Sequence, residues 1–184
     1  MAERFASISD DLARWWAEQP MFFVASAPSG SDGHVNCSPK GLDTLRILSP
    51  TRVAYLDLTG SGVETIAHLR ENRRITLMAC AFAGAPRISR IYGTGTVHEL
   101  GSAGFDELAA NFPELPGRRS VIDVAVERVT TSCGFAVPMM DLVSDRDRLL
   151  DWARAKGDDA LVDYRASKNA QSIDGMPGID ARTR

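Results

Sequence analysis

The stretch Arg52–Arg74, which reads RVAYLDLTGSGVETIAHLRENRR, decides the fold. Its first seven residues are rich in apolar and aromatic side chains, and they predict a strand over Arg52–Leu58. Ser61 followed by Glu64 has the spacing of a capping box, which predicts the start of a helix. That helix should end near Asn72, and its apolar residues recur mostly at helical intervals: Val63, Ile66, Ala67 and Leu69.

Extended runs lie on both sides of this strand–helix unit. The predicted strands are Met21–Ala27, Gly33–Ser38, Arg46–Leu48, Ile75–Phe82, Arg87–Leu100 and Val121–Thr131. The first two should pair as a hairpin, because the turn residues PSGSDGH separate them. Within the longest predicted strand, Arg87–Leu100, Gly93 and Gly95 suit a bulge or the close approach of another backbone.

Helices are predicted at both ends of the chain. An N-terminal helix should start at a Ser9 cap and run to about Gln19, and a short helix is expected over Phe105–Asn111. Two more are predicted near the C-terminus, over Asp145–Lys156 and Ala160–Ala170, with Gly157 ending the first. This order predicts one α+β domain over residues 1–184, built on an antiparallel closed or split barrel, with a helical extension from about residue 144.

Short polar segments beside the Arg52–Leu58 strand suggest an anion site. Free N–H groups at a helix start and the helix dipole favour a phosphate, and the turn TGSG supplies Thr59, Gly60, Ser61 and Gly62. Lys40, in NCSPKG, can add a positive charge from the hairpin. The structural alternative is a capped helix and an ordinary turn, and Glu64 in the first helical turn would repel a phosphate. Neither a P-loop nor a dinucleotide-binding GxGxxG string is present.

The order HVNCSPKG, RVAYLDLTGSGVETIAHLRENRRITLM and RISRIYGTGTVHEL resembles the flavin-binding split-barrel oxidoreductases related to pyridoxamine-phosphate oxidase. The similarity covers roughly Met21–Leu100. It implies an FMN cofactor and a homodimer with the flavin in a groove shared by two subunits. It also implies which residues surround the flavin: Asn36, Ser38, Lys40, Asp57, Thr59, Gly60, Ser61, Gly62, Arg90 and Ser132.

Two departures from that family bear on the substrate. Pyridoxamine-phosphate oxidase proper has an Arg–Lys pair at the start of this helix for the flavin phosphate, where this chain has Glu64 and Thr65. Its arginine-rich C-terminal substrate motif is not visible in SIDGMPGIDARTR. The resemblance therefore implies a flavin without implying the vitamin substrate. Arg90 is open to two interpretations, contact with the reduced flavin or a structural ion pair with Asp57 or Glu99.

Two classes of function are compatible with these residues. One is an FMN-dependent oxidoreductase that takes electrons from a small-molecule donor such as NADH or NADPH. The other is a non-catalytic flavin carrier, stress-type protein or haem-binding relative, and a deazaflavin in place of FMN is a related option. The segment Thr131–Met140 is apolar and predicts a dimer interface, unless the C-terminal helices cover it within one chain.

Composition excludes several other classes. The net charge of −3 gives no basic footprint for nucleic acid. The N-terminus, MAERFASISDDLARWW, has no apolar signal-peptide core, and no apolar run approaches the roughly 20 residues of a membrane span. We therefore expect a cytoplasmic protein. Cys37, Cys80 and Cys133 fit neither a disulfide framework nor a zinc pattern, so we expect three reduced, mostly buried thiols and no metal. His68 is expected on an exposed helix face.

Overall fold

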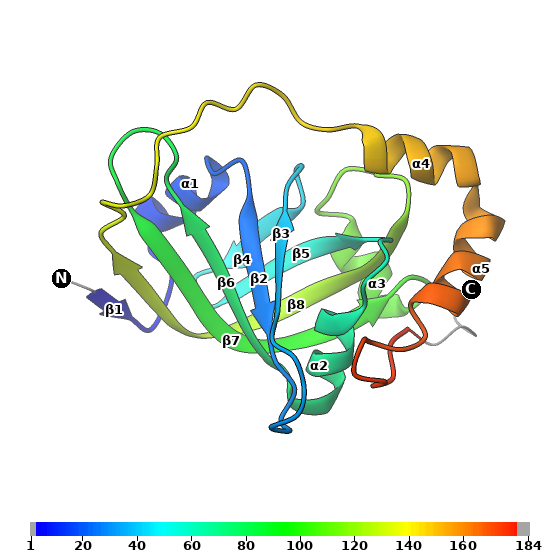
Figure 1. The fold of residues 1–184 in the computed structure, drawn as a ribbon. Helices are drawn as coiled ribbons and strands as arrows, with labels where there is room; N and C mark the ends of the chain where they lie inside the picture. Colours follow the sequence, from blue (N-terminus) through cyan, green and yellow to red (C-terminus); the bar gives the residue numbers. More distant parts are fainter. Residues whose placement is uncertain (1–2, 180–184) are drawn as a thin grey trace.

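The protein, seen in a computed structural model that describes residues 3–179, is built on one antiparallel sheet (Figure 1). The strands follow the order β3-β2-β6-β7-β8-β5-β4, and β1 pairs with β8. Their bounds are β1 Glu3–Phe5, β2 Phe22–Ser26, β3 Asn36–Lys40, β4 Leu45–Ser49, β5 Arg52–Leu58, β6 Arg74–Cys80, β7 Ile88–Glu99 and β8 Arg118–Ser132. The sheet curls without closing, so the expected α+β split barrel with flanking helices is confirmed.

Five helices flank the sheet within the described residues. Their bounds are α1 Asp10–Ala17, α2 Glu64–Asn72, α3 Ala103–Ala109, α4 Arg148–Lys156 and α5 Asp158–Lys168. Ser9 caps α1 as expected, because its hydroxyl accepts a hydrogen bond from the Leu12 N–H. The helix α4 begins three residues later than the sequence suggests, at Arg148, and ends as predicted at Gly157.

The strand β5 explains why RVAYLDL decides the fold. Alternate side chains point to opposite faces of a strand. Val53 and Tyr55 therefore enter the main core with α1 and α2, while Ala54 and Leu56 pack against α3 in a second core. Asp57 lies two residues after Tyr55 in β5, so its carboxylate lies on the same side of the sheet as the Val53 and Tyr55 side chains.

The predicted capping box at Ser61 is wrong. The residue before α2 is Val63, which makes no side-chain cap bond, and Ser61 is exposed two residues earlier. Glu64 does not reach back to a cap. Its carboxylate lies against Gly62 and accepts a hydrogen bond from the Ile173 N–H at 3.3 Å, so a contact from the distant C-terminal chain replaces the local motif.

The glycines of β7 behave as the sequence predicts. The β7–β8 register shifts between Tyr92 and Gly93, which is the expected bulge. A Cβ at Gly93 would strike the backbone of Ala125, and one at Gly95 would meet the Leu69 side chain. These two glycines let β8 and α2 approach β7 closely.

Two predictions about burial are wrong. Cys37 and Cys133 are exposed and only Cys80 is buried, because Cys37 lies on the outward face of β3 and Cys133 follows the end of β8. His68 is fully buried, because α2 packs that face on the sheet, where the His68 Nδ1 lies 2.9 Å from the Ser26 hydroxyl. Across residues 3–179, no helix is long and apolar enough to cross a membrane, and no cluster of metal-binding side chains occurs.

Residues 133–147, here called the strap, connect β8 to α4. Figure 1 shows them arching in yellow from the end of β8 to the opposite side of the molecule. The strap is anchored by the Met140 N–H, which donates to the Phe82 carbonyl at 3.0 Å. Several of its large apolar side chains are exposed: Phe135, Met139, Met140, Leu142 and Val143. The C-terminal helices therefore do not cover this segment, contrary to the single-chain alternative.

Candidate functional site

A cavity of about 700 Å³ opens where β3, β5, the start of α2 and the strap meet. One wall is apolar, with side chains from the strands, from segments next to them and from the strap: Met21, Leu56, Leu58, Phe82, Met140 and Leu142. The other wall is polar and comes from β3, β5 and β8. A cavity of this size, largely apolar with a few convergent polar groups, is typical of a cofactor or small-molecule site.

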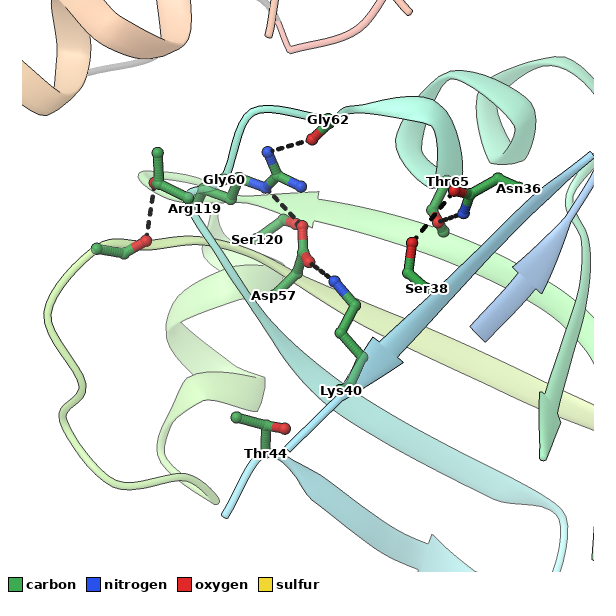
Figure 2. A network of polar contacts seen from close by, with 12 residues as sticks. Asn36, Ser38, Lys40, Thr44, Asp57, Gly60, Gly62, Thr65, Arg119 and Ser120 are labelled. Carbon is green, nitrogen blue, oxygen red and sulfur yellow. Dashed lines mark hydrogen bonds and ion pairs between the residues drawn. The ribbon is translucent and has the colours of Figure 1, made fainter. Parts of the chain in front are cut away.

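The alternation of β3 builds part of the polar wall. Asn36, Ser38 and Lys40 share one half-buried face and line the cavity, whereas Cys37 between them is exposed and does not line it. The side-chain Nδ2 of Asn36 donates to the Thr65 hydroxyl at 3.0 Å, and the Ser38 hydroxyl donates to the side-chain Oδ1 of Asn36 at 3.1 Å. These bonds link β3 to the first turn of α2 and leave a row of small polar groups facing the cavity (Figure 2).

Asp57 is the centre of the polar network. Its two carboxylate oxygens accept from the Lys40 ammonium at 2.7 Å and from the Arg119 Nε at 2.6 Å. Figure 2 shows the carboxylate lying between these two cations. Burial by itself would raise the pKa of Asp57, but Arg119 and Lys40 outweigh it and lower that pKa to about 2. Asp57 is therefore a fixed anion at neutral pH.

The network carries more positive than negative charge. Lys40 and Arg119 share one carboxylate, which leaves a net single positive charge at this end of the cavity. Lys40 also keeps donor capacity, because an ammonium has three N–H groups and Asp57 takes one. The arrangement therefore favours an anionic group near Lys40 and Arg119.

The strand–helix turn is divided between the cavity and the protein interior. Gly60 and Gly62 line the cavity. Thr59 does not, because it is buried and its hydroxyl donates to the Gly117 carbonyl at 2.8 Å. Ser61 is exposed and also lies outside the cavity lining. Glu64 lines the cavity at the start of α2, where its negative charge disfavours a phosphate.

Arg90 and Ser132 lie together elsewhere on the sheet. They face each other across β7 and β8, with 3.5 Å between the Arg90 Nη1 and the Ser132 hydroxyl, and neither lines this cavity. The alternative interpretation of Arg90, a structural ion pair with Asp57 or Glu99, is not supported by the structure. Asp57 is bound by Lys40 and Arg119, and Glu99 is nine residues away along β7, where it pairs with Arg70. Contact of Arg90 and Ser132 with a cofactor stays a prediction.

Several residues of the network are missing from the sequence-based prediction, among them Arg119, Ser120 and Asn169. Arg119 is the second residue of β8 and precedes the predicted start of that strand. It is buried, and nothing in the neighbouring sequence indicates that burial. Asn169 lies beyond α5 and donates to the Gly60 carbonyl at 2.9 Å. The tail sequence NAQSIDGMPG is a visible motif, but nothing local indicates that it reaches the β5–α2 turn.

Comparison with known proteins agrees with this architecture. The family model for pyridoxamine 5'-phosphate oxidase matches residues 8–133. The pyridoxamine 5'-phosphate oxidase family protein ustO of Aspergillus flavus is 42% identical over 200 residues, covering 98% of this chain and 79% of the fungal protein.

Solved structures with low sequence identity share the fold. HupZ of group A Streptococcus has a TM-score of 0.53 and 19% identity, covering 66% of this chain and 91% of that one. A protein from Lactobacillus delbrueckii has a TM-score of 0.52 and 20% identity, covering 68% of this chain and 94% of its own. Since the split-barrel sheet, the family match over most of the chain and the identity to the fungal relative agree, this chain belongs to the pyridoxamine 5'-phosphate oxidase family.

Proposed function

We propose that the protein is an FMN-binding oxidoreductase that holds the flavin in the 700 Å³ cavity. The observation that carries this proposal is the Lys40–Asp57–Arg119 network, a largely buried and net positive group of charges at the polar end of a largely apolar cavity. Family membership supports the same cofactor.

The residues present fit the parts of FMN. The apolar wall suits the flat ring system, and the Asn36, Ser38 and Thr65 side chains offer donors and acceptors for its polar edge or for the ribityl hydroxyls. The phosphate would be held by Lys40 and Arg119. The start of α2 is a poorer place for it, because the Glu64 carboxylate lies there.

The bound flavin would supply hydride or electron transfer, while the protein positions it and sets its electrostatic surroundings. Asp57 is held ionised by its two partners, so it serves to fix Lys40 and Arg119 rather than to exchange a proton. We propose a small-molecule substrate and NADH or NADPH as electron donor.

The haem alternative lacks a histidine ligand in this cavity. None of the three histidines lines it: His34 contacts Asp174, His68 is buried beside Ser26, and His98 lies near Asp123. A haem would therefore have no imidazole from the same chain to bind its iron.

The purified protein tests the proposal directly. We expect a flavin absorption spectrum as purified or after FMN is added, and mass spectrometry of the heat-released cofactor distinguishes FMN from a deazaflavin. Reduction of the bound flavin by NADH or NADPH, followed by absorbance under anaerobic conditions, distinguishes an enzyme from a carrier. A colourless protein that fails to quench FMN fluorescence would contradict the proposal.

A further inference from the structure

We propose that Asn169 is a positioning residue that holds Arg119 and the β5–α2 turn in place for the anionic end of the flavin. This inference rests on the proposed function, and it adds a role for the C-terminal tail. Asn169 does not line the cavity, so it would act through Arg119.

Asn169 is fully buried and uses both ends of its amide. Its Oδ1 accepts from the Arg119 Nη1 at 3.0 Å, and its Nδ2 donates to the Gly60 carbonyl at 2.9 Å and to the Ser61 carbonyl at 3.5 Å. One side chain thus joins a cation of the network to the turn that borders the cavity. A carboxylate could replace the acceptor but not the donor, because an ionised Asp is an acceptor only.

The backbone around Asn169 is fixed on both sides. Its N–H donates to the Arg165 carbonyl at the end of α5, and its carbonyl accepts from the Ile179 N–H, each at 2.8 Å. Gly178 packs against Asn169 and Val63 so closely that a Cβ would collide with them. The tail therefore holds the amide at one place beside Arg119 and does not merely cover the surface.

The neutrality of Asn169 matters for the charge of the site. Arg119 also donates from Nη1 to the Gly62 carbonyl, which is neutral, at 2.8 Å. Among residues 3–179, Asp57 is the one carboxylate that binds Arg119. A second carboxylate at position 169 would cancel the excess positive charge shared by Lys40 and Arg119. The inference therefore predicts that such a carboxylate weakens the binding of a negatively charged ligand but not of a neutral one.

FMN and riboflavin provide this comparison, because riboflavin lacks the phosphate. In Asn169→Asp, which changes shape very little, we expect the Kd for FMN to rise at least about tenfold, the scale of a lost charge-assisted hydrogen bond. The Kd for riboflavin should change by less than about threefold, because riboflavin has no phosphate to be repelled by the added carboxylate. Both constants are measured by flavin fluorescence quenching.

The matched control is Ser172→Ala. Ser172 is a buried polar residue of the same tail, and its hydroxyl accepts from the Met176 N–H at 3.2 Å without touching the Arg119 network. We expect this variant to bind both flavins as the unchanged protein does. An Asn169→Asp protein that fails to fold, or that weakens FMN and riboflavin equally, would overturn the inference and assign Asn169 to the fold alone.

A second measurement separates this inference from the proposed function. In the flavin-free protein, carbon-detected NMR follows the titration of the Asp57 carboxyl. Asn169→Asp should raise the pKa of Asp57, because a second carboxylate competes for Arg119, while Ser172→Ala should leave it unchanged. If the unchanged protein binds neither flavin, the proposed function fails. An unchanged Asp57 pKa in Asn169→Asp would instead overturn the link between Asn169 and Arg119.

Discussion

At the scale of single residues, the site depends on a buried carboxylate, Asp57, which is paired with the buried Arg119 and the half-buried Lys40. A buried carboxylate is costly unless it is paired and hydrogen-bonded, and Asp57 has a cation on each oxygen. The same pairing fixes the Lys40 and Arg119 side chains beside the cavity that both of them line. The net charge of the site and the positions of its side chains therefore depend on the same contacts. A substitution of Lys40, Asp57 or Arg119 should alter both ligand binding and the stability of the fold.

Lys40 should contribute to FMN binding through the phosphate. Lys40→Ala is expected to weaken FMN binding by about 1.5–3 kcal/mol, the scale of a hydrogen bond to a charged group, and to leave riboflavin nearly unaffected. Fluorescence titration measures both. Lys168→Ala, which removes an exposed lysine, is the control for net charge. Equal losses for the two ligands would show that Lys40 supports the fold or the flavin ring instead.

Asp57 should make stability depend on pH in the acid range. Its pKa is about 2 in the folded protein, below the ordinary value of 3.8, so its ionised form stabilises the folded state above about pH 4. That contribution, about 2 kcal/mol from the size of the shift, is lost as the pH falls from about 4 to about 2.

Urea unfolding at several pH values measures this contribution. In Asp57→Asn the stability should be lower at neutral pH and should fall less steeply between about pH 4 and pH 2. Asp11→Asn, which changes an exposed carboxylate, should keep the slope of the unchanged protein. The prediction fails if Asp57→Asn shows that same slope.

At the scale of secondary structure, two strands with opposite burial patterns build the cavity. The strand β5, which lies next to the edge strand β4, is buried on both faces and delivers Asp57, while the edge strand β3 alternates and delivers Asn36, Ser38 and Lys40. They meet because the sheet curls and brings β3 near β5, although four strands separate them in the sheet order. The close contact of β7 and β8 contributes to this curvature through the bulge at Gly93.

Gly93→Ala should destabilise the protein. An added Cβ would meet the backbone of Ala125, which cannot move aside without disturbing the β7–β8 ladder, so a loss of about 1–3 kcal/mol is expected from overpacking. Chemical denaturation measures the change. Gly30→Ala is the control, because a Cβ there meets nothing within 4 Å. Equal stability of the two variants would contradict the close approach at Gly93.

At the scale of the whole molecule, the strap leaves an apolar surface in the single chain. Phe135 is 82% exposed, Met139 79% and Val143 94%. Surfaces of this kind usually mark an interface, and a twofold homodimer is the commonest way to bury one. Since Met140 and Leu142 of the strap also line the cavity, we propose a homodimer whose interface lies beside the flavin site.

Light scattering at micromolar concentration tests the homodimer. The unchanged protein should be a dimer, and Met139→Asp should shift it toward monomer, because the interface would have to bury an unpaired charge. Val35→Asp is the matched control, since Val35 is 75% exposed but lies in the β2–β3 hairpin loop, away from the strap. A monomer that still binds FMN tightly would argue against the shared interface.

The sequence by itself determined every strand except β1, the five helices to within about three residues, and the bulge at Gly93. These features depend on hydrophobic alternation, turn residues and backbone freedom over a few neighbours. It also indicated Lys40 and Asp57, through their places at strand ends and the resemblance to a known family.

Only the tertiary structure decided how these residues work together. The pairing of Asp57 with Arg119 joins β5 to β8, and Asn169 reaches the β5–α2 turn from 109 positions along the chain. The absence of a Ser61 cap, the burial of His68 and the exposure of the strap likewise depend on which distant segments pack against these residues. Such contacts depend on the curl of the sheet and the path of the C-terminal tail, which no local pattern of residues encodes.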